Sequence, residues 1–217
     1  MADIKPIETV YNGYRFRSRL EARWAVFFDE IGAEWEYEPE GFELPDGTKY
    51  LPDFLLKNVR GRGASEIYVE IKGKLTKEDL EKISKFSLSA ELDDKGNFIV
   101  HGKPIIIFGT IPDCKWREPR WLNTIVTFWG KSRPAKVYFD GEWEIDYSKD
   151  DDEHFYNLCY SEIGENYCTQ PKAAKGGGLV LDYPDDPYDY VDDDKTVNAF
   201  ITARQARFEH GETPKVR

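Results

Sequence analysis

Two carboxylates and one amine within residues 49–74 have the types and spacing to do chemistry together. Asp53 stands in an apolar run, YLPDFLL, where a lone carboxylate is costly to bury. Glu70 and Lys72 belong to a second run, EIYVEIK, whose two-residue alternation predicts a strand with both side chains on one face. Carboxylates brought together beside an amine can share a metal ion, which lowers the cost of burial. These residues therefore predict a metal site with a lysine beside it.

The motif formed by Pro52-Asp53 and Glu70-x-Lys72 stands out because it joins two consecutive apolar segments with a loop between them. Other acidic-x-Lys tripeptides of the chain fall in turns, in acidic runs or beside a proline. The motif resembles the signature of the PD-(D/E)xK nuclease superfamily. The end of the chain, ITARQARFEHGE, looks like the closing helix of phage-encoded members. The resemblance implies an α/β fold with a restriction-endonuclease-like core of a helix, a mixed central sheet and a crossover helix.

The resemblance also implies a role for each motif residue. Asp53 and Glu70 would bind Mg²⁺, for which Mn²⁺ would substitute, and the Ile71 carbonyl would complete the coordination. Lys72 would orient or deprotonate the attacking water, or stabilise the phosphate. The implied activity is metal-dependent hydrolysis of phosphodiester bonds in DNA, by an endonuclease rather than an exonuclease.

A helix that precedes the motif is predicted from Ser18, a plausible N-cap, to Gly32. Leu20, Trp24, Phe27 and Ile31 form its apolar stripe. Glu21 has two interpretations. In the first, it stands three residues after Ser18 and completes a capping box. In the second, it is the acidic residue that nucleases of this superfamily often carry on this helix, with a catalytic, metal-binding or orienting role.

Several basic residues are candidate contacts to nucleic acid. Four arginines crowd the entrance of this helix, either as the phosphate-contacting edge of a cleft or as a solvated face: Arg15, Arg17, Arg19 and Arg23. Lys74 is a further candidate, although Gly73 should turn it away from the site. Arg204 and Arg207 lie three residues apart on a predicted C-terminal helix, where a plain surface position is the alternative.

The rest of the first 110 residues, the predicted nuclease core, supplies the remaining elements of an α/β fold. Residues 34–44 alternate aromatic and acidic side chains, which predicts a half-exposed strand leading through a hairpin to Asp53. Thr76 begins a predicted helix with Leu80, Ile83 and Ser87 facing inward. The run KPIIIFG at 103–109 predicts a buried strand. This order of strand, helix and strand predicts a parallel crossover.

The second half of the chain is predicted in three parts. Residues 111–149 form a β-rich extension that includes a hairpin over 136–147, and residues 150–194 an irregular, acidic segment containing Gly and Pro. Residues 195–217 hold a helix that packs back on the core through Val197, Ile201 and Phe208. Zinc binding by His154, Cys159 and Cys168 is not favoured, because paired ligand spacing is absent.

The net charge of −11 opposes broad attraction to nucleic acid, and much of the acid lies in the second half. It supports a second hypothesis, in which the chain is a non-catalytic inhibitor or binding protein that mimics DNA or engages a basic partner through its acidic segment. Neither a membrane-spanning run nor a signal peptide is evident, so the expected location is the cytoplasm. A second copy of the chain is a candidate partner, since many members of the superfamily pair to cut both strands.

Overall fold

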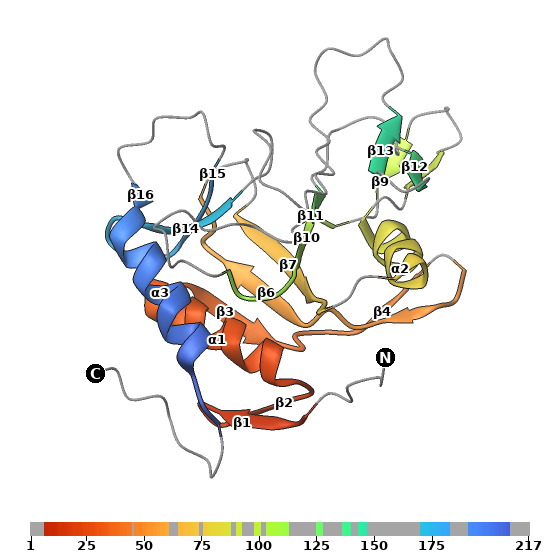
Figure 1. Ribbon diagram of the computed structural model, residues 1–217. Helices are drawn as coiled ribbons and strands as arrows, with labels where there is room; N and C mark the ends of the chain where they lie inside the picture. The colour runs from red at the N-terminus through yellow and green to blue at the C-terminus, as the bar shows by residue number, and fades with distance from the viewer. Residues whose placement is uncertain are drawn as a thin grey trace.

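The computed structural model describes residues 7–44, 46–60, 65–73, 76–87, 90–92, 98–100, 103–112, 125–127, 136–139, 143–146, 170–182 and 191–208. Within these residues the chain is a mixed α/β protein with three helices around a five-stranded sheet (Figure 1). No helix in this part of the chain is long and apolar enough to cross a membrane.

The central sheet is mixed and has the strand order β11-β10-β7-β6-β3. Its strands are β3 (Glu34–Tyr37), β6 (Phe54–Lys57), β7 (Glu66–Ile71), β10 (Ile105–Phe108) and β11 (Ile125–Thr127). Strands β7 and β10 run parallel and are joined through α2 (Lys77–Ser87), while the other neighbours are antiparallel. The predicted parallel crossover is therefore confirmed.

Two helices far apart in the sequence, α1 (Arg19–Ile31) and α3 (Asp193–Gln205), lie side by side over one face of the sheet (Figure 1). Trp24 stacks on Phe108 of β10 with ring centroids 4.3 Å apart, and Phe27 stacks on Phe200 of α3 at 4.2 Å. Gly32 ends α1 in the left-handed conformation, as predicted, with a φ of 73°. The apolar stripe of α1 thus packs against the central sheet and against α3.

The opposite face of the sheet packs against α2 and a short hairpin formed by β4 (Phe42–Glu43) and β5 (Lys49–Tyr50). Leu55, Tyr68 and Ile107 of the sheet meet Ile83 and Phe86 of α2 in this second core cluster. Ile83 is buried, as predicted. The predicted single strand over 34–44 instead breaks after β3, because Glu38 has a φ of 46° and turns the chain.

Three further two-stranded sheets belong to the described residues. One is β1 (Thr9–Tyr11) with β2 (Tyr14–Phe16), and another is β8 (Ala90–Leu92) with β9 (Phe98–Val100). The third joins β12 (Lys136–Phe139) to the antiparallel β13 (Trp143–Asp146), which confirms the hairpin predicted over 136–147.

The prediction of an irregular segment over 150–194 is wrong for residues 170–182 and 191–192. These residues form a small sheet of β14 (Gln170–Ala174), β15 (Leu179–Asp182) and β16 (Val191–Asp192). The physical reason is burial, because Leu179, Val180 and Leu181 pack into the molecule. The glycines at 176–178 all have a φ near +90° and form the turn between β14 and β15.

Helix α3 begins two residues earlier than predicted, and its packing matches the prediction in part, because Val197 and Phe208 pack against the core as predicted. Asp192 caps it by accepting from the Lys195 amide at 2.9 Å. Its buried side chains are Thr196, Ala199, Phe200 and Ala203, whereas Ile201, predicted to face inward, is exposed. Alanines at two of these positions let the backbones of α1 and α3 approach, so small residues rather than large ones mark the buried face.

Candidate functional site

Asp53 lies just before β6, buried between two strands. Its amide donates to the Val69 carbonyl at 3.0 Å, and the pairing of Phe54 with Val69, continued by one residue, places Asp53 opposite Glu70. Its Oδ2 accepts from the Ile71 amide at 2.7 Å, and only 4% of the residue is exposed. The apolar residues around Asp53 thus bury its carboxylate beside β7, as the sequence predicted.

Glu70 points to the other face of β7 from Val69 and Ile71, which pack into the main core. Its Oε2 accepts a hydrogen bond from the Tyr50 hydroxyl at 2.7 Å, and Oε1 lies 2.9 Å from the Lys72 amine. Glu70 is 6% exposed. The predicted pairing of Glu70 with Lys72 on one face is confirmed, and Tyr50 is a partner that sequence reasoning missed.

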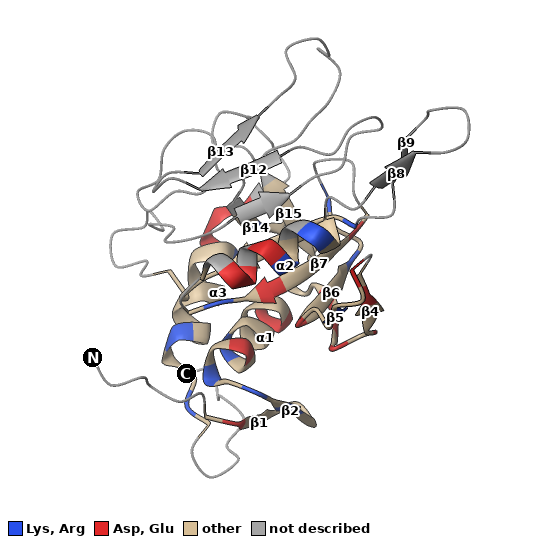
Figure 2. Ribbon diagram, turned by 90° about the vertical axis from the view of Figure 1, so that its right-hand side faces the viewer, with Lys and Arg blue, Asp and Glu red and all other residues tan. Residues whose placement is uncertain are grey.

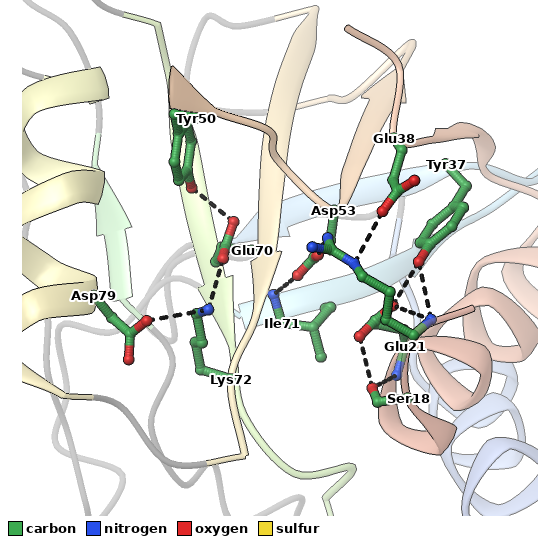
Figure 3. Close-up of polar contacts among 11 residues, drawn as sticks. Ser18, Glu21, Tyr37, Glu38, Tyr50, Asp53, Glu70, Ile71, Lys72 and Asp79 are labelled. Atoms are coloured by element: carbon green, nitrogen blue, oxygen red, sulfur yellow. Dashed lines mark hydrogen bonds and ion pairs between the residues drawn. The ribbon is translucent and has the colours of Figure 1, made fainter. Parts of the chain in front are cut away.

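Lys72 is shared between two carboxylates. Its Nζ lies 3.2 Å from Asp79 in the first turn of α2, in addition to its contact with Glu70 (Figure 3). Burial alone lowers the pKa of Lys72, but Glu70 and Asp79 outweigh it and hold the pKa above its ordinary value. In this arrangement Lys72 is an ammonium group at neutral pH.

Glu21 lies at the first turn of α1 and accepts from three donors. Ser18 Oγ donates to Oε1 at 2.7 Å, while Oε2 accepts from the Tyr37 hydroxyl at 2.7 Å and the Arg17 amide at 3.1 Å. Ser18 Oγ in turn accepts from the Glu21 amide at 3.2 Å, so the predicted N-cap is confirmed. Glu21, which is 6% exposed, is therefore a buried carboxylate fixed by its own helix entrance.

Arg17 brings a cation to the carboxylates. Its guanidinium forms an ion pair with Asp53, and its Nε lies 2.9 Å from Glu38 Oε1, although half of the side chain, 55%, is exposed. Figure 2, in which Lys and Arg are blue, shows basic residues between the β1–β2 hairpin and the first turns of α1. Of these, Arg17 reaches the site, whereas exposed Arg15 pairs with Glu8 at 3.2 Å on the hairpin. Arg19 and Arg23 lie on the first two turns of α1.

The two arginines predicted to contact nucleic acid from the C-terminal helix, Arg204 and Arg207, do not both lie on that helix. Arg204 donates to the Ile111 carbonyl at 3.1 Å and so ties α3 to the segment after β10. Arg207 is exposed but follows the end of α3 at Gln205, so the prediction that Arg204 and Arg207 share a helix face is wrong. The physical reason is the extended conformation of Ala206, with a φ of −57° and a ψ of 127°. Lys74, His154, Cys159 and Cys168 fall outside the described residues.

The electrostatics of the site favour a cation near Asp53. Burial raises the pKa of Asp53 well above its ordinary value, and the charges of Glu70 and Glu21 raise it further. The Ile71 amide and Arg17 oppose this shift only in part. Burial is the main cause of the shift and the charges of Glu70 and Glu21 add to it, so the folded protein disfavours an uncompensated negative charge on Asp53.

The donor set suits a hard divalent cation. Asp53, Glu70 and the Ile71 carbonyl offer oxygen atoms, which Mg²⁺ and Mn²⁺ prefer. No three His, Cys, Asp or Glu side chains within the described residues form a ready metal cluster. Arg17 and Lys72 neutralise the carboxylates instead, so a divalent ion at Asp53 would have to compete with Arg17.

Sequence reasoning missed four residues that hold the site together: Tyr37, Glu38, Tyr50 and Asp79 (Figure 3). Asp79 had a signal, because it stands three residues after the N-cap Thr76 and accepts from the Thr76 amide and hydroxyl, as the second residue of a capping-box pair does. Tyr37 and Tyr50 are aromatic residues in strands, where a core position and a site position look alike in the sequence.

Comparisons of this chain with family models, with curated proteins and with solved structures gave no match.

Proposed function

We propose that this protein is a metal-dependent nuclease that hydrolyses phosphodiester bonds of DNA, on a core of the restriction-endonuclease-like type. The observation that carries the proposal is the pair of buried carboxylates, Asp53 and Glu70, opposite one another on neighbouring chain segments with the Lys72 amine 2.9 Å from Glu70. Burying two carboxylates against each other costs stability, and binding a divalent cation is the chemistry that recovers it.

Asp53 and Glu70 are the proposed metal ligands, with the Ile71 carbonyl as a third. A bound Mg²⁺ would activate a water and offset charge that develops on the phosphate. Lys72 carries its own positive charge, so its role is to orient the attacking water and stabilise the phosphate rather than to take a proton in its present ion-paired state.

Glu21 and Arg17 support this site in different ways. Glu21 accepts from Ser18, Tyr37 and the Arg17 amide, so its role is to position the entrance of α1 rather than to coordinate the ion. Arg17 stands half-exposed on Asp53 and is the proposed phosphate contact, released from Asp53 when the metal takes its place.

The test is cleavage of labelled linear duplex, single strand, nicked circle, branched junction and RNA with Mg²⁺, Mn²⁺ or EDTA. Lys72→Ala should lower metal-dependent cleavage at least about 100-fold. Lys57→Ala is the matched control, because Lys57 also pairs with a glutamate across the sheet but does so at the surface, and it should cut as wild type does.

Equal activity of wild type and Lys72→Ala would contradict the proposed site. If a folded wild-type protein cuts none of the substrates, the nuclease proposal fails, and the acidic binding or inhibitor protein becomes the working hypothesis. That hypothesis predicts capture of a basic partner, which neutralising substitutions in the acidic segment should abolish.

A further inference from the structure

A cavity of about 390 Å³ opens on the face of the molecule that carries the β4–β5 hairpin, and one of its lining residues, Tyr50, donates a hydrogen bond to Glu70. Its lining residues come from the hairpin and the segment leading to Asp53: Gly41, Phe42, Glu43, Lys49, Tyr50 and Leu51. We propose that this cavity binds one unpaired nucleobase of the substrate, next to the phosphate that is cut. This inference rests on the proposed nuclease function and deepens it, since it assigns a substrate class to the same site.

Tyr50 links the cavity to the carboxylates. It lines the cavity, is itself buried, and donates its hydroxyl hydrogen to Glu70 at 2.7 Å. Leu51 follows it in the cavity wall, and Asp53 comes two residues later. A group in the cavity is therefore separated from Glu70 by the length of one tyrosine side chain. With a phosphate at Asp53 and Glu70, the group that reaches the cavity belongs to a neighbouring nucleotide.

The walls have the chemistry that a base needs. The Phe42 ring is held in place by edge contacts with Phe86 and Tyr68, at centroid distances of 5.0 and 5.5 Å. Phe42 and Leu51 form the apolar part of the lining, on which a heterocycle can pack, and Lys103 Nζ lies 5.6 Å from the centre of the Phe42 ring. Glu43 and Lys49 are paired across the hairpin and exposed, where a carboxylate can accept from a base amine and an ammonium can meet a phosphate.

The size of the cavity sets the form of the substrate. A volume of about 390 Å³ lies at the small end of ligand pockets and suits a single base with its sugar. A base that enters it must leave its stack and its pairing partner, which costs least in a single strand or beside a branch or frayed end. Single-stranded or locally unpaired DNA is therefore the expected preferred substrate.

The experiment is a matrix of substrates and variants measured by kcat/KM. The substrates are a single strand with one cleavage position and the same strand with an abasic site moved through each neighbouring position. Leu51→Ala removes part of the wall, and Gly41→Leu fills the cavity, since a Cβ at Gly41 meets no atom within 4 Å. Ile201→Ala is the matched control, because Ile201 is 38% exposed on α3 and Leu51 is 37% exposed.

One abasic position should lower wild-type cleavage about tenfold, the size of one lost base-stacking contact. Leu51→Ala and Gly41→Leu should lower cleavage of the intact strand by a similar factor. On that abasic strand the same two variants should cause little further loss. Ile201→Ala should leave cleavage of both strands unchanged. Equal cleavage at every abasic position, or losses that multiply between variant and substrate, would overturn the inference and leave the nuclease proposal standing.

A binding measurement in EDTA separates the two proposals. A single strand carrying 2-aminopurine should change its fluorescence when wild type or Ile201→Ala binds, and change it less with Leu51→Ala and Gly41→Leu. If no strand is cut but this difference is present, the nuclease proposal fails and the base pocket is supported. A fluorescence change that is the same in all four proteins would overturn the pocket.

Discussion

Glu21 and Glu70 flank Asp53 and match closely in their surroundings, yet they are held differently. Each is 6% exposed, and each accepts from a tyrosine hydroxyl at 2.7 Å, Tyr37 for Glu21 and Tyr50 for Glu70. The other donors to Glu21 are a serine hydroxyl and a backbone amide, both within four residues of it. Glu70 is instead paired with the Lys72 amine, which it shares with Asp79 (Figure 3).

The difference separates a carboxylate held at the entrance of its own helix from the one that we propose as a metal ligand. Local neutral donors fix Glu21 in one orientation and stabilise the start of α1. The charge of Glu70 is balanced by a lysine with a second carboxylate available, so Lys72 can move toward Asp79 without losing its ion pair. A carboxylate whose counter-cation can be exchanged is the one suited to binding a metal.

The largest effect should come from exchanging the two glutamates for glutamine, one at a time. Glu70→Gln removes a proposed metal ligand and should lower cleavage at least about 100-fold. Glu21→Gln keeps most of the local hydrogen bonds and should lower it about tenfold or less. Initial rates at saturating Mg²⁺, with the folded state of both variants checked by circular dichroism, measure the difference. Similar losses in both would erase the distinction and make Glu21 a ligand.

A smaller effect concerns the pH dependence of stability without metal. Because the pKa of Asp53 is raised in the folded state, the folded protein holds this proton over a window in which the unfolded chain releases it. The free energy of unfolding of the wild type should therefore fall as pH rises from about 4 to about 8, relative to Asp53→Asn, by at least about 1 kcal/mol.

Urea unfolding of both proteins in EDTA at a series of pH values measures this relative slope. The carboxylates at Glu70 and Glu21 supply part of the shift, so Glu70→Gln should reduce the slope without removing it. Parallel stability profiles of wild type and Asp53→Asn would show that Arg17 neutralises Asp53 fully.

The smallest effects should come from removing the two tyrosine hydroxyls. Tyr37 donates to Glu21 and accepts from the Arg17 amide at 3.1 Å, so Tyr37→Phe should lower the free energy of unfolding by about 1–2 kcal/mol. Tyr50→Phe removes the bond to Glu70 and should cost about 1 kcal/mol. The rate of cleavage should show the opposite order, with a larger loss in Tyr50→Phe than in Tyr37→Phe. A common order in both measurements would contradict the division of roles.

The sequence predicted the parts of the site that local pattern controls. Alternation in EIYVEIK placed Glu70 and Lys72 on one face, and the Ser18 cap placed Glu21, because strand periodicity and helix capping are set within a few residues. The ion pairs of Lys72 with Asp79 and of Arg17 with Asp53 were not predicted. They depend on how helices and strands pack, which single-sequence patterns do not contain.

The same limit explains the errors in the second half of the chain. The acidic composition of residues 150–194 hid a short buried run, Leu179–Leu181, of which Leu179 and Leu181 pack in one core cluster with residues of α1 and α3. On α3, the large Ile201 suggested the inward face, but close helix contact selects Ala199 and Ala203 instead. Both errors arise where a distant partner decides which residues are buried.

Residues more than 140 positions later in the chain form hydrogen bonds and ring contacts with the end of α1. The Ile31 carbonyl accepts from the Gly178 amide at 2.9 Å and from the Lys195 amine at 3.0 Å, and Phe200 covers the ring of Phe27. These contacts have a high contact order, so they are slow to form. During synthesis Phe27 lacks its partner Phe200 until α3 has been made, which leaves part of the apolar face of α1 open to aggregation and to chaperones. The carboxylate site, which begins on α1, therefore gains its final rigidity late in the life of the nascent chain.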